Sequence, residues 1–249
     1  MNTPVRTIVL FSLSGAPGVS TLALAVAAAW PTQERAVLVE ADASGGDVAA
    51  WRHLPASPGL VELAAAARAP DPDDDGVLAG CVQVLPGGLG VCPAPASADR
   101  AAGAVALLAG RPAVLTPPEG MVAVVDVGRL APRSAAARLA AAADAAVLVV
   151  ADDTAHLKRA RDALPGLRAG IGRLGLAVVG GTHPRAQIVE ALETPVWARI
   201  PTDPRGAAFL RGESGSRRAG RRPLLAGARR LAQTLTATAA VGEQAVSTP

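Results

Sequence analysis

Short apolar runs alternate with longer alanine-rich segments along most of the chain. The apolar runs are rich in β-branched residues and predict strands over residues 6–13, 36–40, 81–85, 121–127, 145–152, 174–181 and 195–201. The segments between them predict helices over residues 20–30, 59–69, 97–110, 132–143, 154–164 and 184–193. Because continuous apolar strands that alternate with helices are typical of a parallel sheet buried on both faces, we predict a doubly wound α/β fold with a mostly parallel sheet.

Length and composition fit a single domain. The chain has 249 residues and is 50% hydrophobic, which is enough for one sizeable core. We predict that residues 1–238 form this domain and that residues 239–249 form a disordered tail. Cys81 and Cys92 lie in no motif that binds metal or marks a disulfide framework, so we expect the protein in the reducing cytoplasm.

A glycine-rich turn, SLSGAPGVSTL at residues 12–22, separates the first predicted strand from the first predicted helix. The backbone N–H groups of such a turn, together with the helix N-terminus, can hold a phosphate group. The predicted phosphate-binding residues are Ser14, Gly15, Ala16, Gly18, Val19, Ser20 and Thr21. Glu40, Asp42 and Asp126 follow or end other predicted strands. Since ligands of doubly wound sheets bind outside the carboxyl ends of the strands, we expect these features to converge on one rim.

The order of these features resembles the MinD/ParA family of P-loop ATPases. The family's loop reads K-G-G-x-G-K-T-T, and residues 14–21 (SGAPGVST) align with it. Four further segments resemble family motifs in the expected order: residues 37–47 (VLVEADASGGD), 57–65 (SPGLVELAA), 121–128 (MVAVVDVG) and 195–213 (PVWARIPTDPRGAAFLRGE). The resemblance runs from residue 6 to about residue 235, and it implies a P-loop NTPase fold.

The resemblance also implies roles for individual side chains. Asp42 matches the family aspartate that contacts magnesium or the attacking water, so it is the candidate catalytic residue if the protein is active. The metal-binding candidates are Ser20, Asp42 and Asp126, and the base-binding candidates are Pro201 and Asp203. The family asparagine that reads adenine is absent, and Gly180 and Gly181 stand in its place.

Both lysines of the family's loop are missing, and Ser14 and Val19 stand in their places. A P-loop lysine reaches the β- and γ-phosphates and offsets charge as the phosphoryl group is transferred. Losing one such donor costs on the order of 3 kcal/mol of transition-state stabilisation. We therefore expect weak or absent binding of ATP and Mg²⁺, and we favour a pseudo-ATPase over an ATP hydrolase. Arg129 and Lys158 are the candidate substitute cations.

Three functions stay open at this stage. The first is a pseudo-ATPase that acts as a spatial organiser or assembly scaffold. Within the family, the atypical loop and the Gly-Asp pair at residues 46–47 most resemble the CpaE/TadZ branch, which implies a role for pilus or secretion machinery. This hypothesis implies a homodimer and a protein partner.

The other two functions depend on the C-terminal region. A weak but active ATPase in chromosome or plasmid partitioning would contact DNA through the candidate residues Arg217, Arg218, Arg221 and Arg222, although these arginines also fit a solvated basic face. A membrane-associated MinD-like regulator would place the amphipathic segment 224–235 on anionic lipid, although this segment also fits a helix packed on the sheet. The expected location is cytoplasmic, including the periphery of the membrane or nucleoid.

Overall fold

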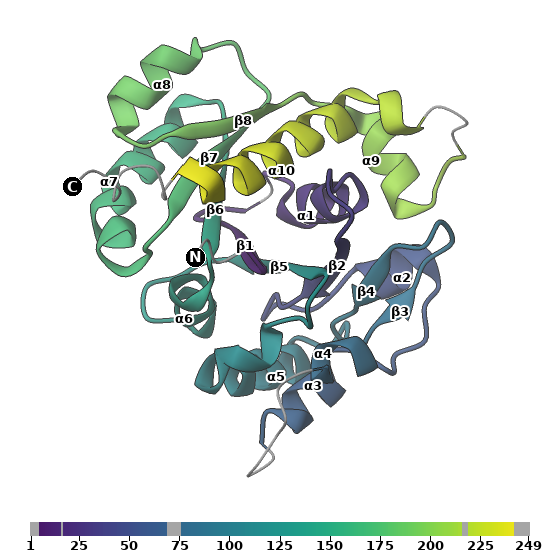
Figure 1. Ribbon diagram of the computed structural model, residues 1–249. Coiled ribbons are helices and arrows are strands. Elements are labelled where there is room, and N and C mark those ends of the chain that lie inside the picture. Colours follow the sequence, from purple (N-terminus) through teal and green to yellow (C-terminus); the bar gives the residue numbers. More distant parts are fainter. Residues whose placement is uncertain (1–4, 16, 69–75, 216–218, 242–249) are drawn as a thin grey trace, which may run out of the picture.

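The strands form one eight-stranded sheet in the order β3-β4-β2-β5-β1-β6-β7-β8 (Figure 1). The computed structural model describes residues 5–15, 17–68, 76–215 and 219–241. The strands are β1 Thr7–Ser12, β2 Arg35–Glu40, β3 Gln83–Val84, β4 Gly90–Cys92, β5 Met121–Arg129, β6 Ala145–Ala151, β7 Leu174–Val179 and β8 Val196–Ile200. Neighbouring strands are parallel except β3 and β4. The predicted mostly parallel α/β fold is confirmed.

Helices cover both faces of this sheet. They are α1 Val19–Ala28, α2 Val48–Arg52, α3 Leu60–Ala66, α4 Val77–Gly80, α5 Ala98–Gly110, α6 Ala135–Ala142, α7 Thr154–Gly170, α8 Arg185–Leu192, α9 Pro204–Arg211 and α10 Pro223–Val241, with short 3₁₀ turns at Pro112–Leu115 and Ala219–Arg221. Alternate residues of β1 point to opposite faces. Ile8 and Leu10 join the core with α1, α9 and α10, whereas Val9 and Phe11 join the core with α3, α5, α6, α7 and α8.

The last helix, α10, lies across α1 and β8 (Figure 1). Its apolar side chains are buried within the domain: Leu224, Leu225, Ala228, Leu231, Ala232 and Leu235. The amphipathic pattern of residues 224–235 is therefore explained by packing against the sheet, and the same face is not free to contact lipid. Among the described residues, the helices are too short or too polar to cross a bilayer. α10 extends to Val241, and the rest of the predicted tail lies outside the described residues.

Two predictions about local structure were wrong. The helix predicted over residues 154–164 continues through Pro165 to Gly170. Pro165 is exposed, whereas Leu164 and Leu167 pack against the core, so tertiary packing holds the helix together despite the missing N–H. The strand predicted over residues 81–85 is only Gln83–Val84, and it pairs with a strand, β4, that the sequence pattern did not predict.

Candidate functional site

The glycine-rich turn connects β1 to α1, as predicted. Gly18 is the N-cap residue of α1 and has a φ of 83°, a left-handed conformation that favours glycine. The first turn of α1 contains no acidic residue, and no side chain caps its N–H groups. These donors and the helix dipole are therefore available to an anion. Gly15 has no such conformation, and a Cβ there would meet nothing within 4 Å, so the local backbone does not require glycine at that position.

A pocket of about 400 Å³ lies beside this turn. Its lining comes from the turn, the start of α1, the end of β5 and the segment from β2 to α2: Ser12, Gly15, Pro17, Gly18, Val19, Ser20, Thr21, Asp42, Ser44, Trp51, Gly128 and Arg129. Most of the predicted phosphate-binding residues are thus brought together. Ser14 is buried and does not line the pocket, and Ala16 lies outside the described residues.

The three predicted metal-binding residues are also close to one another. Asp126 is buried, accepts a hydrogen bond from the Gly128 N–H at 2.9 Å, and is hydrogen-bonded to the Ser20 side chain. Burial raises the pKa of Asp126 to about 6 against these two hydrogen bonds, and the nearby carboxylates of Asp42 and Asp47 raise it further. A hydroxyl and two carboxylates fit Mg²⁺, which takes oxygen ligands and completes its shell with water and phosphate oxygens.

Asp42 is oriented by its own loop and by β5. Its Oδ1 accepts a hydrogen bond from the Ser44 N–H at 2.8 Å and also contacts the Ser44 hydroxyl. Its Oδ2 lies so close to Gly128 that a Cβ there would approach it to 1.8 Å. The described residues contain no cluster of three His, Cys, Asp or Glu side chains able to hold a metal ion. Phosphate and water oxygens would therefore have to complete a magnesium site here.

Glu40, the last residue of β2, has a structural role. Its side chain is buried and accepts three backbone hydrogen bonds, from Asp47 and Val48 at 3.0 Å each and from Ala94 at 3.1 Å. Burial raises its pKa to about 7, although the three hydrogen bonds act to lower it. Glu40 thus fixes the turn that leads from Asp42 to α2.

The structure separates the two candidate substitute cations. Arg129 lines the pocket at the end of β5. Lys158 lies on α7, away from the pocket lining, and forms an exposed ion pair with Asp162 at 3.2 Å. Only Arg129 is therefore placed near the glycine-rich turn.

The two predicted base-binding residues lie between β8 and α9 and do not line this pocket. Asp203 is the N-cap residue of α9 and accepts hydrogen bonds from the N–H groups of Gly206 at 2.8 Å and Leu224 at 3.4 Å. Pro201 packs close to Gly227 of α10. Both residues stabilise the junction of α9 and α10, and their contact with a nucleotide base stays a prediction.

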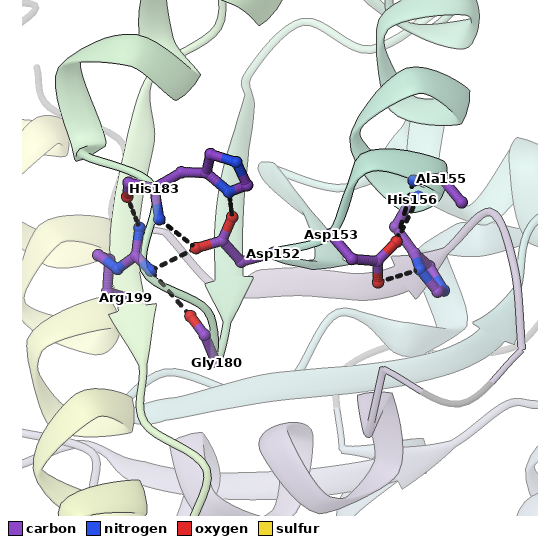
Figure 2. A network of polar contacts seen from close by, with 7 residues as sticks. All are labelled: Asp152, Asp153, Ala155, His156, Gly180, His183 and Arg199. Carbon is purple, nitrogen blue, oxygen red and sulfur yellow. Dashed lines mark hydrogen bonds and ion pairs between the residues drawn. The ribbon is translucent and has the colours of Figure 1, made fainter.

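Sequence inspection missed a polar network at the ends of β6, β7 and β8 (Figure 2). The side chain of Asp152 has no exposed surface; it pairs with Arg199 at 2.7 Å and with His183 Nδ1 at 2.6 Å. Arg199 also donates to the carbonyl oxygens of Gly180 at 2.8 Å and His183 at 2.7 Å. Burial acts to raise the pKa of Asp152, but the hydrogen bonds from Arg199 and His183 outweigh it and lower the pKa.

The turn after β7 is a glycine pair, Gly180 and Gly181, that lies beside this network. Both Gly180 and Gly181 have positive φ, 67° and 65°. A Cβ on Gly181 would approach Asp152 to 2.2 Å. The turn after β7 is therefore packed directly on the Asp152 carboxylate.

The C-terminal arginines are described only in part. Arg217 and Arg218 lie outside the described residues. Arg221 is exposed at the end of a 3₁₀ turn, and Arg222 is half-buried just before α10. Neither forms an ion pair within the part of the chain that the structure describes, and their contact with DNA or lipid stays a prediction.

The sheet order, the turn between β1 and α1, and the carboxylates at the ends of β2 and β5 define an α/β fold of the P-loop NTPase type. The same fold occurs in MinD from Pyrococcus furiosus, a cell division ATPase (TM-score 0.74, 15% identity, 96% of this chain and 100% of that chain). It also occurs in a ParA family ATPase from Chlorobium tepidum TLS (0.65, 19%, 94% and 98%). A third example is the septum site-determining protein MinD from Pyrococcus horikoshii OT3, complexed with Mg-ADP (0.62, 16%, 97% and 97%). No protein-family model and no curated protein matches the sequence.

Proposed function

We propose that this protein is a MinD/ParA-like pseudo-ATPase that acts as a spatial organiser or assembly scaffold. The observation that carries the proposal is a glycine-rich turn whose backbone is suited to phosphate binding but which lacks both lysines of the family's loop. The left-handed Gly18, the uncapped start of α1 and the gathered Ser20, Asp42 and Asp126 are present, whereas Val19 and Ser14 stand at the lysine positions. Such a site favours binding of a nucleotide without efficient turnover.

When bound, ATP–Mg²⁺ would supply a charged ligand that orders the turn and the surfaces beside it. The N–H groups at the start of α1 would hold the phosphates, and Ser20, Asp42 and Asp126 would hold the metal. Under this proposal, the protein forms a homodimer and acts through a protein partner. Pilus or secretion machinery of the CpaE/TadZ kind is the partner class that the sequence resemblance favours.

Calorimetry with ATP–Mg²⁺, together with a phosphate-release assay, tests this proposal. We expect saturable but weak binding that Asp42→Ala abolishes, and little or no phosphate release. The matched control is Asp162→Ala, which removes an exposed carboxylate that lies away from the pocket. Saturable phosphate release that Asp42→Ala abolishes and Asp162→Ala retains would contradict the pseudo-ATPase proposal.

The exposed arginines of α10 favour a second candidate function, a weak ATPase that binds DNA. Arg229 and Arg230 are exposed and, like Arg221, form no ion pair with an acidic side chain among the described residues. Under this alternative, DNA would stimulate turnover, and its binding would weaken steeply with salt. A double substitution, Arg229→Gln with Arg230→Gln, would then reduce the salt dependence. The scaffold proposal expects no such stimulation.

A further inference from the structure

Arg129 reaches the phosphate-loop pocket because β5 carries a bulge. The strands pair Leu10 with Asp126 and then Ser12 with Arg129, so β5 has one more residue than β1 between these pairs. Gly128 lies in the bulge with a φ of 62°, and its carbonyl oxygen accepts a hydrogen bond from the Ser12 hydroxyl at 3.5 Å. The strand therefore continues past Asp126 and places the Arg129 side chain at the rim of the pocket.

Among the described residues, the side chains around the pocket offer this arginine no ion-pair partner. Asp42 lines the pocket and Asp126 lies buried next to it. Arg129 is the single cationic side chain among the described lining residues, and within the described part of the chain it makes no ion pair and no hydrogen bond with either carboxylate. Its exposed guanidinium is thus free to meet an anion that enters the pocket.

We propose that Arg129 binds the phosphate chain of the nucleotide and supplies the positive charge that Val19 cannot provide. This inference rests on the proposed nucleotide site. The backbone N–H groups of α1 approach a phosphate from the glycine-rich turn, whereas Arg129 approaches it from β5. A guanidinium donates hydrogen bonds in a planar fork that matches two phosphate oxygens, so it suits a di- or triphosphate better than a single ammonium would.

The assignment also defines which part of the ligand is recognised. Arg129 and the start of α1 contact phosphate, and the predicted base-binding residues lie outside this pocket. Inorganic tripolyphosphate with Mg²⁺ should therefore compete with ATP, and removing Arg129 should weaken both ligands by a similar factor. Adenosine, which carries no phosphate, should not bind to this pocket.

The test is calorimetric titration of the full chain with ATP–Mg²⁺ and with tripolyphosphate–Mg²⁺. We expect Arg129→Gln to weaken both by about 10- to 100-fold, the range for losing a hydrogen bond between charged groups. Arg138→Gln is the matched control, because Arg138 is an exposed arginine on α6 that does not line the pocket. Arg129→Lys, which keeps the charge but loses the fork, should give an intermediate affinity.

A lysine restored to the loop gives a second, independent measurement. Val19→Lys should strengthen binding, and Arg129→Gln in that background should cost less than in the wild type, because the two cations serve the same phosphates. Equal affinities for Arg129→Gln and Arg138→Gln would overturn the assignment and leave the proposed function intact. Wild-type protein that binds neither ligand, while Val19→Lys binds both, would overturn it as well. Rapid phosphate release by the wild type would instead overturn the pseudo-ATPase proposal alone.

Discussion

Two regions at the carboxyl edge of the sheet differ in how their carboxylates are paired. At β2 and β5, burial raises the pKa of Glu40 to about 7 and of Asp126 to about 6, and neither carboxylate has an ion-pair partner among the described side chains. At β6 and β8, the Asp152 side chain also has no exposed surface, although the residue as a whole is only half-buried, and it pairs with Arg199 and His183 (Figure 2). The first region therefore has carboxylates without ion-pair partners and N–H groups at the start of α1 without side-chain acceptors, and an external ligand can bind to both. In the second region, the carboxylate is paired with side chains of the protein itself.

The largest expected effect concerns Glu40, which stabilises the segment between β2 and α2 in the first region. Glu40→Ala leaves three N–H groups without their acceptor, and we expect a loss of about 3–5 kcal/mol in the free energy of unfolding. Glu40→Gln, which keeps most of the acceptor, should lose less. Denaturant titration measures both, with Glu190→Ala on the exposed face of α8 as the control. A loss for Glu40→Ala no larger than that of the control would contradict the positioning role.

The next effect concerns the ion pair of Asp152 with Arg199 in the second region. Arg199→Met removes the main partner of a carboxylate with no exposed surface, and because Arg199 is itself 30% exposed we expect a loss of about 2–3 kcal/mol. Lys158→Met breaks the exposed pair with Asp162 and should cost less than about 0.5 kcal/mol. Chemical denaturation of the two variants side by side decides the matter. Similar losses for the two variants would show that the network in Figure 2 stabilises the protein no more than an exposed ion pair does.

A smaller effect distinguishes the two glycines of the phosphate-loop turn. Gly18→Ala places a Cβ on a left-handed residue and should destabilise the protein by about 1–2 kcal/mol. Gly15→Ala meets no atom and no conformational penalty, so its effect should lie within about 0.5 kcal/mol. Thermal and denaturant unfolding would reveal the difference. A larger loss for Gly15→Ala than for Gly18→Ala would contradict the left-handed conformation of Gly18.

The smallest expected effect is a change in the pH dependence of stability. The folded-state pKa of Asp152 is lowered, because the hydrogen bonds from Arg199 and His183 outweigh burial. Its contribution is therefore complete above the unfolded value of about 3.9 and is lost as the pH falls through the folded value. Asp152→Asn removes this titration, so its stability should fall less steeply than that of the wild type between about pH 5 and about pH 2. Asp162→Asn, at an exposed site, should keep the wild-type slope.

The features that could be predicted from the sequence are those that depend on local order along the chain. The alternation of apolar runs and helices determines the sheet, and the spacing of Gly18 from β1 marks the turn at α1. The Asp152 network could not be predicted in this way, because its partners lie 31 and 47 residues away and meet only when β6, β7 and β8 are side by side. Pro165 was misjudged for a related reason, since packing of its neighbours overrides a local signal.

The position of Arg129 also could not be predicted from the sequence, although Arg129 is only three residues from Asp126. The sequence places an arginine soon after Asp126, but only the bulge in β5 determines that it reaches the pocket. Glu40 is a further example. The sequence places it at the end of a predicted strand, whereas the three backbone hydrogen bonds that it accepts come from two separate segments of the chain.

The position of α10 also has a consequence for how the protein is made. The helix α1, near the start of the chain, completes its packing only against residues of Pro223–Val241. A ribosome that has not yet translated these residues therefore carries a nascent chain in which the side of α1 that packs on α10 remains exposed to water. Such long-range closure slows folding and prolongs the period in which other chains or chaperones can bind this face.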